Sequence, residues 1–388
     1  MTHEEKSNAM AEIVQLVMED GLEGLGPAVS ILLNEAMRIE RNRALAAEPW
    51  ERTPERKGHA NGYKPRTLKT RLGKLDLQVP QVRGDVEFYP SALERGQRSE
   101  RALKVALAEM YVEGVSTRNV TDVLEAMCGT TVSSSEVSRA SALLDEELEK
   151  WRTRPLAKVP YLVLDARYEK VRRDGAVVSA AVLIASGVDA LGYRTILGVS
   201  VSLSEAEVHW REFLRSLKQR GLYGIEMITS DDHDGLKAAL RSTFPAVPWQ
   251  RCQVHLQRNA AGYVPRTHMR GEVAQTIREI FTAPDREEAQ RLLDKAVDKY
   301  QKSASKLAAW MEENLPEGFT VFSLPSKLRR RLRSTNMMEW VNKEIRRRTR
   351  VAGLFPNEKS LLRLVSAILV EISEDWESGR KYVSLNEE

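Results

Sequence analysis

Three acidic residues stand where carboxylates could hold divalent metal ions. Asp165 closes the apolar run at residues 161–164, and Asp231 closes a second run at residues 225–230. Aspartate is depleted in strands because its charge resists burial, so an aspartate at each strand end indicates a specific role. Glu339 lies at the start of a basic helical segment. Two strand-end aspartates and a helical glutamate are oxygen ligands suited to two Mg²⁺ ions in phosphoryl transfer on nucleic acid.

Two of these three acids also have a purely structural interpretation. Asp231 begins the sequence Asp-Asp-His-Asp-Gly and could cap a helix, in which case Asp232 or Asp234 would be the ligand. Asn336-x-x-Glu339 has the form of a capping box, so Glu339 could serve only to begin its helix. The residues by themselves leave these alternatives open.

Hydrophobic periodicity predicts the elements that must position the three acids. Strands are expected at 161–171, 176–187, 191–202, 225–230 and 249–254, with helices at 205–220 and 233–243. Three hairpin-linked strands followed by alternating helices and strands are typical of an α/β, RNase H-like fold, a mixed sheet flanked by helices. In that fold the strand that ends before Asp231 lies beside the strand that bears Asp165.

The chain should divide into six regions. The RNase H-like catalytic core is expected at 156–255 and again, as C-terminal helices from 333 to 388, after an all-helical insertion at 256–332. Three regions precede this core: an N-terminal helical region that could serve dimerisation (1–50), a basic linker and β-hairpin (51–97), and a helix-turn-helix-like DNA-binding domain (98–155). Residues 49–66 are Pro-, Gly- and Arg-rich and are predicted to be the linker.

The helix-turn-helix-like region contains three short helical segments. The first two are expected to stop at Gly114 and Gly129, and the third opens with a capping box from Ser133 to Glu136. Its exposed side would offer four polar residues to a DNA groove: Ser134, Ser135, Ser138 and Arg139. Many three-helix modules bind nothing, so this pattern alone leaves DNA contact open.

Positive charge is concentrated in two segments. Residues 327–350 hold ten Lys or Arg and two Glu, and residues 51–74 hold eight Lys or Arg and two Glu. The formal net charge of the whole chain is only +4, so the remainder is acidic. Such segregation favours a polyanion such as DNA as partner over a uniformly solvated surface.

The basic helix that begins near Asn336 has two distinct faces. Helical spacing places Asn342 and Arg346 on the face of Glu339, and directs a neighbouring apolar stripe, Met338, Val341 and Ile345, onto the sheet. The other cations of this helix are expected to contact phosphates, because Arg and Lys bind them as charged donors: Lys343, Arg347, Arg348 and Arg350.

Only two cysteines are present, Cys128 and Cys252, which favours a reducing cytoplasm over a disulfide framework. Cys252 and His255 form a Cys-x-x-His pair, half of a zinc site, but no second pair with suitable spacing exists, so a structural role is expected. The N-terminus has no secretory signal pattern, and the longest apolar run, 176–190, is too short to span a membrane.

The chain resembles the Mutator-type transposases of bacterial insertion sequences, a branch of the DDE transposases with an RNase H-like core. The resemblance extends from about residue 60 to the C-terminus and is carried by an ordered set of motifs: Gly114-Val-Ser-Thr-Arg-Asn, Trp151-Arg-Thr-Arg-Pro-Leu, Leu164-Asp-Ala-Arg-Tyr-Glu-Lys-Val-Arg, Phe213-Leu-Arg-Ser-Leu, Ser230-Asp-Asp-His-Asp-Gly-Leu-Lys, Trp249-Gln-Arg-Cys-Gln-Val-His-Leu-Gln-Arg-Asn and Ser334-Thr-Asn-Met-Met-Glu-Trp-Val-Asn-Lys-Glu-Ile-Arg-Arg-Arg-Thr-Arg.

Matching these motifs to the family assigns roles to individual residues. The resemblance implies that Asp165, Asp231 and Glu339 are the catalytic, metal-binding triad, which selects Asp231 over Asp232, and that Cys252 and His255 are the family's Cys-x-x-His signature. The sequence departs from the family at Asp232, where a small residue is usual, and at Met337, Met338 and Trp340 beside the glutamate. None of these departures removes a carboxylate.

The resemblance also implies a function. A transposase of this kind binds terminal inverted repeats of double-stranded DNA, cuts at the element ends and joins the freed 3′-OH to target DNA, with two Mg²⁺ ions per site (Mn²⁺ as a substitute). A homodimer in the bacterial cytoplasm, associated with the nucleoid and not with a membrane, is expected. The alternative is a non-catalytic DNA-binding protein or repressor that retains the fold, and an RNase H-like nuclease is a weaker third hypothesis.

Overall fold

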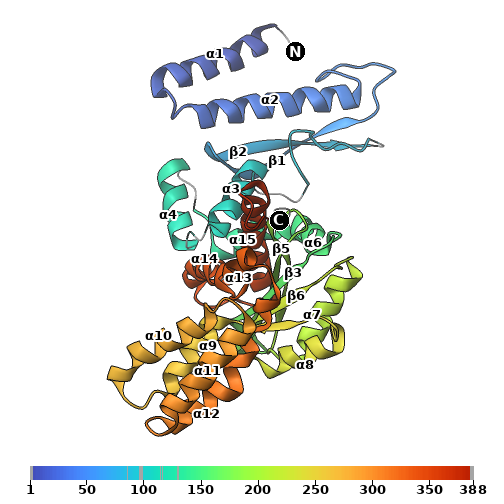
Figure 1. The fold of residues 1–388 in the computed structure, drawn as a ribbon. Helices are drawn as coiled ribbons and strands as arrows, with labels where there is room; N and C mark the ends of the chain where they lie inside the picture. Colours follow the sequence, from blue (N-terminus) through green and yellow to red (C-terminus); the bar gives the residue numbers. More distant parts are fainter. Residues whose placement is uncertain are drawn as a thin grey trace. The chain divides into compact units, whose positions relative to one another are not determined.

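The chain forms two compact units, Met1–Leu143 and Leu144–Glu388. The structure is a computed structural model, and it describes residues 3–84, 86–95, 99–113, 115, 117–128 and 131–384. Both units combine helices with a sheet (Figure 1). The expected α/β class is therefore confirmed.

The first unit begins with a helical hairpin and a β-hairpin. Helices α1 (His3–Asp20) and α2 (Leu25–Leu45) precede strands β1 (His59–Thr70) and β2 (Gly73–Arg83), which pair antiparallel. Met37 of α2 packs on Leu75, Leu77 and Val79, the alternate apolar residues of β2. The prediction of a linker at 49–66 is wrong at its C-terminal end, because residues from His59 onward pair with β2.

Three short helices complete the first unit: α3 (Arg101–Val112), α4 (Thr117–Cys128) and α5 (Ser134–Ser141). They share a small apolar core that includes Leu107, Val120 and Val137. The predicted capping box is present, since Ser133 Oγ accepts from the Glu136 N–H and the Glu136 carboxylate accepts from the Ser133 N–H. The expected stops at Gly114 and Gly129 lie outside the described residues.

A five-stranded sheet forms the centre of the second unit. Its strands are β3 (Tyr161–Arg173), β4 (Ala176–Val188), β5 (Arg194–Ser202), β6 (Met227–Ser230) and β7 (Trp249–Arg251), in the order β5-β4-β3-β6-β7. β3, β4 and β5 are antiparallel neighbours, whereas β6 runs parallel to β3 and β7 parallel to β6. The expected adjacency of the first and fourth strands of this sheet is therefore confirmed.

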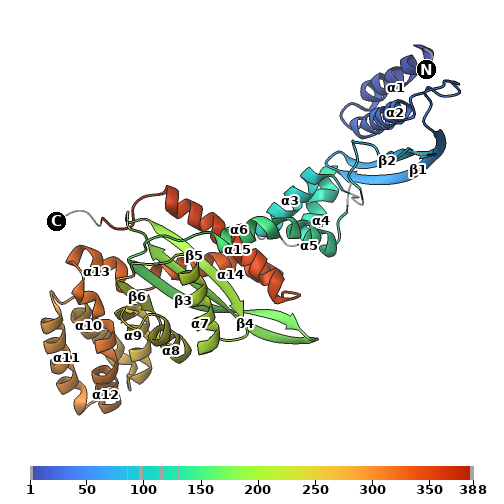
Figure 2. The same ribbon diagram turned by 90° about the vertical axis from the view of Figure 1, so that its right-hand side faces the viewer.

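Helices cover both faces of this sheet (Figure 2). On one face, α7 (Glu207–Gln219) and α8 (Asp234–Thr243) bury Trp210 and Leu236 against Leu162 and Leu164 of β3. On the other face lie α14 (Asn336–Ala352) and α15 (Glu358–Ser378). Helix α6 (Asp145–Thr153) packs against α15, where Arg363 donates to Asp145. Side chains alternate along β3, so Val163 and Asp165 point to the α14 face.

Between β7 and α14 the chain forms a helical lobe, residues 253–332. It contains α9 (Gln253–Ala260), α10 (Arg270–Phe281), α11 (Arg286–Gln301), α12 (Ser305–Asn314) and α13 (Ser326–Leu332), joined in part by 3₁₀ turns. The lobe has its own apolar core, in which Ile277, Leu293 and Phe319 are almost completely buried. Within the described chain, no helix is both long and apolar enough to cross a membrane.

Candidate active site

Asp165 lies on β3 and faces α14. The side chain of Asn342, one turn after Glu339 on that helix, donates a hydrogen bond from Nδ2 to Asp165 Oδ2. Among the residues that the structure describes, Asp165 has no Arg or Lys within ion-pair distance, although it is part-buried. An inward-facing carboxylate without a cationic partner is costly to keep ionised.

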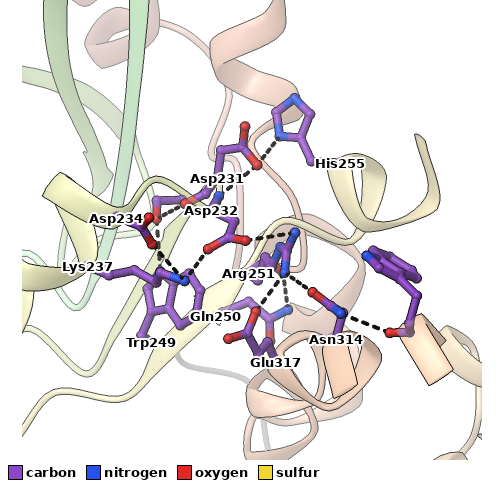
Figure 3. Close-up of polar contacts among 12 residues, drawn as sticks. Asp231, Asp232, Asp234, Lys237, Trp249, Gln250, Arg251, His255, Asn314 and Glu317 are labelled. Carbon is purple, nitrogen blue, oxygen red and sulfur yellow. Dashed lines mark hydrogen bonds and ion pairs between the residues drawn. The ribbon is translucent and has the colours of Figure 1, made fainter. Parts of the chain in front are cut away.

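Asp231 follows the last residue of β6 and is half exposed. Its Oδ1 lies 3.6 Å from Nδ1 of His255, which is on α9. In Figure 3 the Asp231 side chain points towards His255, and its Oδ1 also accepts a 2.7 Å hydrogen bond from the backbone N–H of Asp232. Because β6 runs parallel to β3 and is paired with it, Asp231 at the end of β6 lies next to the strand that bears Asp165.

Asp232 has a different environment from Asp231. It forms ion pairs with Lys237 and, at 2.9 Å, with Arg251, whose side chain is only 4% exposed (Figure 3). Arg251 also contacts Glu317 and Asn314 of the helical lobe. Asp232 is therefore a member of an ion-pair network around the buried Arg251, and this network joins the end of β6 to the lobe.

Glu339 lies in the first turn of α14 and is part-exposed. Its carboxylate forms a 2.7 Å ion pair with Arg258 of α9. The apolar stripe of α14 packs as predicted, since Met338, Val341 and Ile345 are fully buried and Ser186 of β4 donates to the Met338 sulfur at 3.0 Å. This packing fixes the side of α14 on which Glu339 and Asn342 project.

A polar contact joins β3 to the middle of α14. Arg167, two residues after Asp165 on the same face of β3, donates to the Asn342 carbonyl and to Glu169. Glu169 in turn accepts a 3.0 Å hydrogen bond from Thr349. These contacts hold α14 along β3, so that the helix is positioned by polar as well as apolar contacts.

The pKa values of Asp165, His255 and Cys252 are shifted from their usual ranges. Burial raises the pKa of Asp165 to about 6, against the lowering effects of Asn342 and of the His255 charge. A hydrogen bond with Cys252, reinforced by the charges of Asp231 and Asp165, raises the pKa of His255 to about 9. Burial raises the pKa of the Cys252 thiol, but hydrogen bonds from His255 and Thr335 outweigh it and the net shift is downward. His255 is thus a cation at neutral pH beside two carboxylates.

Cys252 immediately precedes α9 and is almost completely buried. Its sulfur accepts from the backbone N–H and the hydroxyl of Thr335, both at 3.3 Å, immediately before α14. Its own N–H donates to the Ser230 carbonyl at the end of β6. Cys252 of the Cys-x-x-His pair therefore joins β6, α9 and the start of α14.

The donor atoms at this site suit a hard divalent cation. Asp165, Asp231 and Asn342 supply oxygens of the kind that Mg²⁺ prefers. Asn342 Oδ1 is buried and has no hydrogen-bond partner within the described chain. In the same part of the chain, no three His, Cys, Asp or Glu side chains stand close enough to hold one ion, and Glu339 is held by Arg258. The chemistry fits Mg²⁺, but a three-acid site needs Glu339 to leave Arg258.

Comparison with known proteins gives the family. Residues 1–379 match the family model for "Transposase, Mutator family". The chain belongs to the Mutator family of transposases. It is 54% identical to the transposase of insertion sequence element IS406 from Burkholderia multivorans, over 98% of each chain. It is 43% identical to that of ISRM5 from Rhizobium meliloti (100% of this chain, 97% of the relative). It is 36% identical to that of IS256 in transposon Tn4001 from Staphylococcus aureus, over 98% of each.

The side chains expected to contact DNA fall into two groups in this Mutator-family chain. Ser135 and Arg139 on α5, and Lys343, Arg346, Arg347 and Arg350 on α14, are exposed. Arg348 differs, because it is 5% exposed and both of its terminal nitrogens donate to Glu371 of α15. Held by that carboxylate, Arg348 is not positioned for a phosphate, which corrects the expectation for this residue.

Sequence reasoning missed two residues of the site. Arg258 stands three residues after His255 in the family motif, so helical spacing alone would have placed it on the same face. Arg167 stands two residues after Asp165, so strand alternation would have placed it on the Asp165 face. The network of Asp232 with Arg251 and Lys237 had no comparable signal, because its partners come from separate elements.

Proposed function

We propose that this protein is a DNA transposase that cuts the ends of an insertion sequence and joins them to target DNA. The proposal assigns the catalytic roles to Asp165, Asp231 and Glu339, on an RNase H-like core into which the helical lobe is inserted. One observation carries it: in a Mutator-family chain, Asp165 and Asp231 come from adjacent parallel strands, and neither has a Lys or Arg ion-pair partner within the described residues.

The sheet supports the RNase H-like assignment. Three antiparallel strands, β5-β4-β3, continue into the parallel strands β6 and β7, as that fold requires. The helical lobe separates β7 from α14 and has a core of its own. An inserted lobe of this kind leaves Asp165 on β3, Asp231 after β6 and the helix of Glu339 in one site.

The residues of the site would bind two Mg²⁺ ions, or Mn²⁺ as a substitute. Bound there, the ions would supply positive charge for both the attacking and the leaving oxygen at phosphorus. Asp165 and Asp231 would act as oxygen ligands, Asn342 would hold the Asp165 carboxylate in place, and Glu339 would complete the site after leaving Arg258. The His255 cation would moderate repulsion between the two aspartates.

The reaction would consist of two displacements at phosphorus. In cleavage, a water oxygen attacks the phosphodiester at the element end, the 3′ oxygen leaves with a proton, and the flanking strand keeps the 5′ phosphate. In joining, the freed 3′-OH attacks a target phosphodiester and loses its proton, and the target's own 3′ oxygen takes up a proton and leaves as a hydroxyl. Neither step needs an oxidant or a nucleotide cofactor.

Double-stranded DNA would be held by exposed cations and polar side chains. The exposed ones are Lys343, Arg346, Arg347 and Arg350 on α14 and Ser135 and Arg139 on α5, whereas Asn342 is part-buried and donates to Asp165. The guanidinium fork of Arg donates two parallel hydrogen bonds to phosphate, which suits contacts that position a duplex. The terminal inverted repeats and the target would both be bound in this way, in the cytoplasm of a bacterial cell.

A homodimer is part of the proposal, because two element ends must be brought together. Helix α1 offers an apolar stripe for it, since Met10, Val14 and Met18 are exposed at helical spacing. Sedimentation of the wild type and of a variant with a charged stripe, Val14→Glu with Met18→Glu, tests the assignment. A dimer that persists in the variant would place the interface elsewhere.

Strand cleavage and joining of labelled DNA test the function. The substrate would carry the inverted repeats that flank the source gene, and the wild type would be compared with Asp165→Asn in the presence of Mg²⁺. Cleaved and joined products are expected from the wild type alone, with DNA binding retained by both proteins. A wild type that binds the repeats without cutting them would instead support the non-catalytic alternative.

A further inference from the structure

A cavity in the helical lobe is lined by arginines and contains no acid. Its volume is about 550 Å³, and it lies between α13 and the turn that joins α10 to α11. Its floor and walls are formed by ten residues: Phe281, Thr282, Ala283, Pro284, Val321, Phe322, Ser326, Arg329, Arg330 and Arg333. Three of the ten carry a permanent positive charge, so the cavity, called here the arginine pocket, is strongly cationic.

The three arginines of this pocket are not equivalent. Arg329 is part of its wall, since its guanidinium donates to the carbonyls of Leu324 and Pro284 and lies 5.5 Å over the Phe322 ring. Arg330 and Arg333 make no ion pair or side-chain hydrogen bond with the residues that the structure describes. They are three positions apart at the end of α13, so they project on the same side.

The pKa of Arg333 is lowered in this arrangement. Burial lowers the pKa of its guanidinium, and the charge of Arg330 lowers it further. Two guanidinium groups that line one cavity without a carboxylate repel each other, and an anion between them would remove that repulsion. The aromatic walls at Phe281 and Phe322 reduce contact with water and so strengthen the attraction for such an anion.

We propose that the arginine pocket binds one backbone phosphate of the transposon DNA through Arg330 and Arg333. This inference rests on the proposed function and deepens it by adding a DNA contact on the helical lobe. The planar forks of two arginines suit the non-bridging oxygens of a phosphodiester. Inorganic phosphate offers the same oxygens, so the experiment must distinguish a DNA phosphate from a free one.

The position of Arg333 links the pocket to the candidate active site. The Arg333 carbonyl accepts a 3.1 Å hydrogen bond from the N–H of Gln253, at the start of α9. Two residues later Thr335 bonds to the Cys252 sulfur, and α14 with Glu339 begins at Asn336. A phosphate held by Arg333 would therefore have a fixed register relative to the helix that carries the third acid.

Salt dependence of DNA binding tests the contact on the full-length chain. For Arg330→Gln/Arg333→Gln, the slope of log affinity against log salt should fall by about one unit, because one phosphate is no longer neutralised. The matched control is Lys302→Gln/Lys306→Gln, which removes the same charge from exposed positions of the lobe outside the pocket. A pocket variant with the slope of the wild type, or a control with the same loss as the pocket variant, would overturn the proposal.

Melting temperatures show whether the pocket variant has lost only a DNA contact or also part of its stability. Measured with and without inorganic phosphate, they also show whether the pocket binds a free anion. Without ligand, the pocket variant should melt no lower than the wild type, because no intramolecular partner of Arg330 or Arg333 is lost within the described chain. A lowered melting temperature with an unchanged slope would show that the two arginines only stabilise the lobe. Stabilisation by inorganic phosphate at constant ionic strength, again with an unchanged slope, would identify a free-anion site instead.

A cleavage assay of the wild type tests the proposed function independently of the arginine pocket. If the wild type cuts element ends but the pocket variant binds DNA with an unchanged slope, only the arginine pocket is wrong. If the wild type does not cut, while the pocket variant has the reduced slope, the proposed chemistry is wrong and the DNA contact stands.

Discussion

Two adjacent aspartates at the end of β6 have opposite environments. Asp231 turns towards His255 and the strand of Asp165, without an Arg or Lys ion-pair partner in the described chain, whereas Asp232 is neutralised by Arg251 and Lys237. The first lies with acids that repel one another, and the second lies in an ion-pair network that joins β6 to the helical lobe. Adjacent residues of one type can therefore have different roles, which we propose to be catalysis for Asp231 and stability for Asp232.

The same contrast applies to the arginines. Arg348 of α14 is buried against Glu371, whereas Arg330 and Arg333 near the end of α13 face a cavity without acids. A count of basic residues along the sequence treats them alike. The presence of an intramolecular counter-charge separates a cation that stabilises the fold from one that is available to DNA.

Removing the Asp232 carboxylate should have the largest effect on stability. Asp232→Asn leaves the buried Arg251 without one of its two acids, which should reduce the free energy of unfolding by about 2–4 kcal/mol. Denaturant unfolding measures this loss. Asp234→Asn is the matched control, because Asp234 is fully exposed and lies 3.7 Å from the same lysine. Equal stability of the two variants would contradict the assigned role of Asp232.

Asp165→Asn should change stability in the opposite direction. The pKa of Asp165 is about 6 in the folded chain against 3.8 for the unperturbed group, so the folded state binds the proton more tightly. The free energy of unfolding of the wild type should therefore fall as the pH rises through this window. In metal-free buffer the variant should be more stable than the wild type at pH 8, by about 1–3 kcal/mol, and of similar stability below pH 4.

Added Mg²⁺ sharpens this second prediction. By binding the ionised carboxylate, the metal should raise the melting temperature of the wild type at pH 8 and leave that of Asp165→Asn nearly unchanged. A variant less stable than the wild type at pH 8 would mean that the Asp165 carboxylate is satisfied within the folded chain. The proposed metal site would then lose its main support.

Arg258→Gln should have the smallest effect. The ion pair of Arg258 with Glu339 is exposed on both sides and contributes no more than about 1 kcal/mol. Freeing Glu339 should lower the Mg²⁺ concentration for half-maximal cleavage by about two- to five-fold, since 1 kcal/mol corresponds to about a factor of five. A Mg²⁺ titration of cleavage measures this shift. A higher requirement for Mg²⁺ would show that Arg258 supports the active arrangement rather than competing with it.

The order of elements in the second unit could be predicted from the sequence. Strand-like apolar runs predict β3 and β4, and an apolar stripe at helical spacing predicts α14. In the structure these apolar residues are buried in the core. In the first unit, by contrast, the Pro, Gly and charged residues of β1 do not predict the strand that the pairing with β2 stabilises. Local sequence does not encode a partner strand, so the linker was predicted too long.

The candidate site could be predicted only in part. The resemblance to the family singled out Asp165, Asp231 and Glu339, and the structure adds what surrounds each of them. Partners far apart in sequence, such as Asn342 for Asp165 and Glu371 for Arg348, depend on how α14 lies between β3 and α15. Residue types and spacing do not determine such contacts, which is why Arg348 was assigned to DNA and Arg333 was not singled out.

The most direct measurement is Mg²⁺-dependent cleavage of element-end DNA by Asp231→Asn and Asp232→Asn, side by side. Both would be assayed at a temperature at which circular dichroism shows them folded. We expect Asp231→Asn to lose cleavage by on the order of 10³-fold or more, because a metal ligand is removed, and Asp232→Asn to stay within about ten-fold of the wild type, because its carboxylate serves the fold. Cleavage by Asp231→Asn together with an inactive, folded Asp232→Asn would contradict the proposed active site.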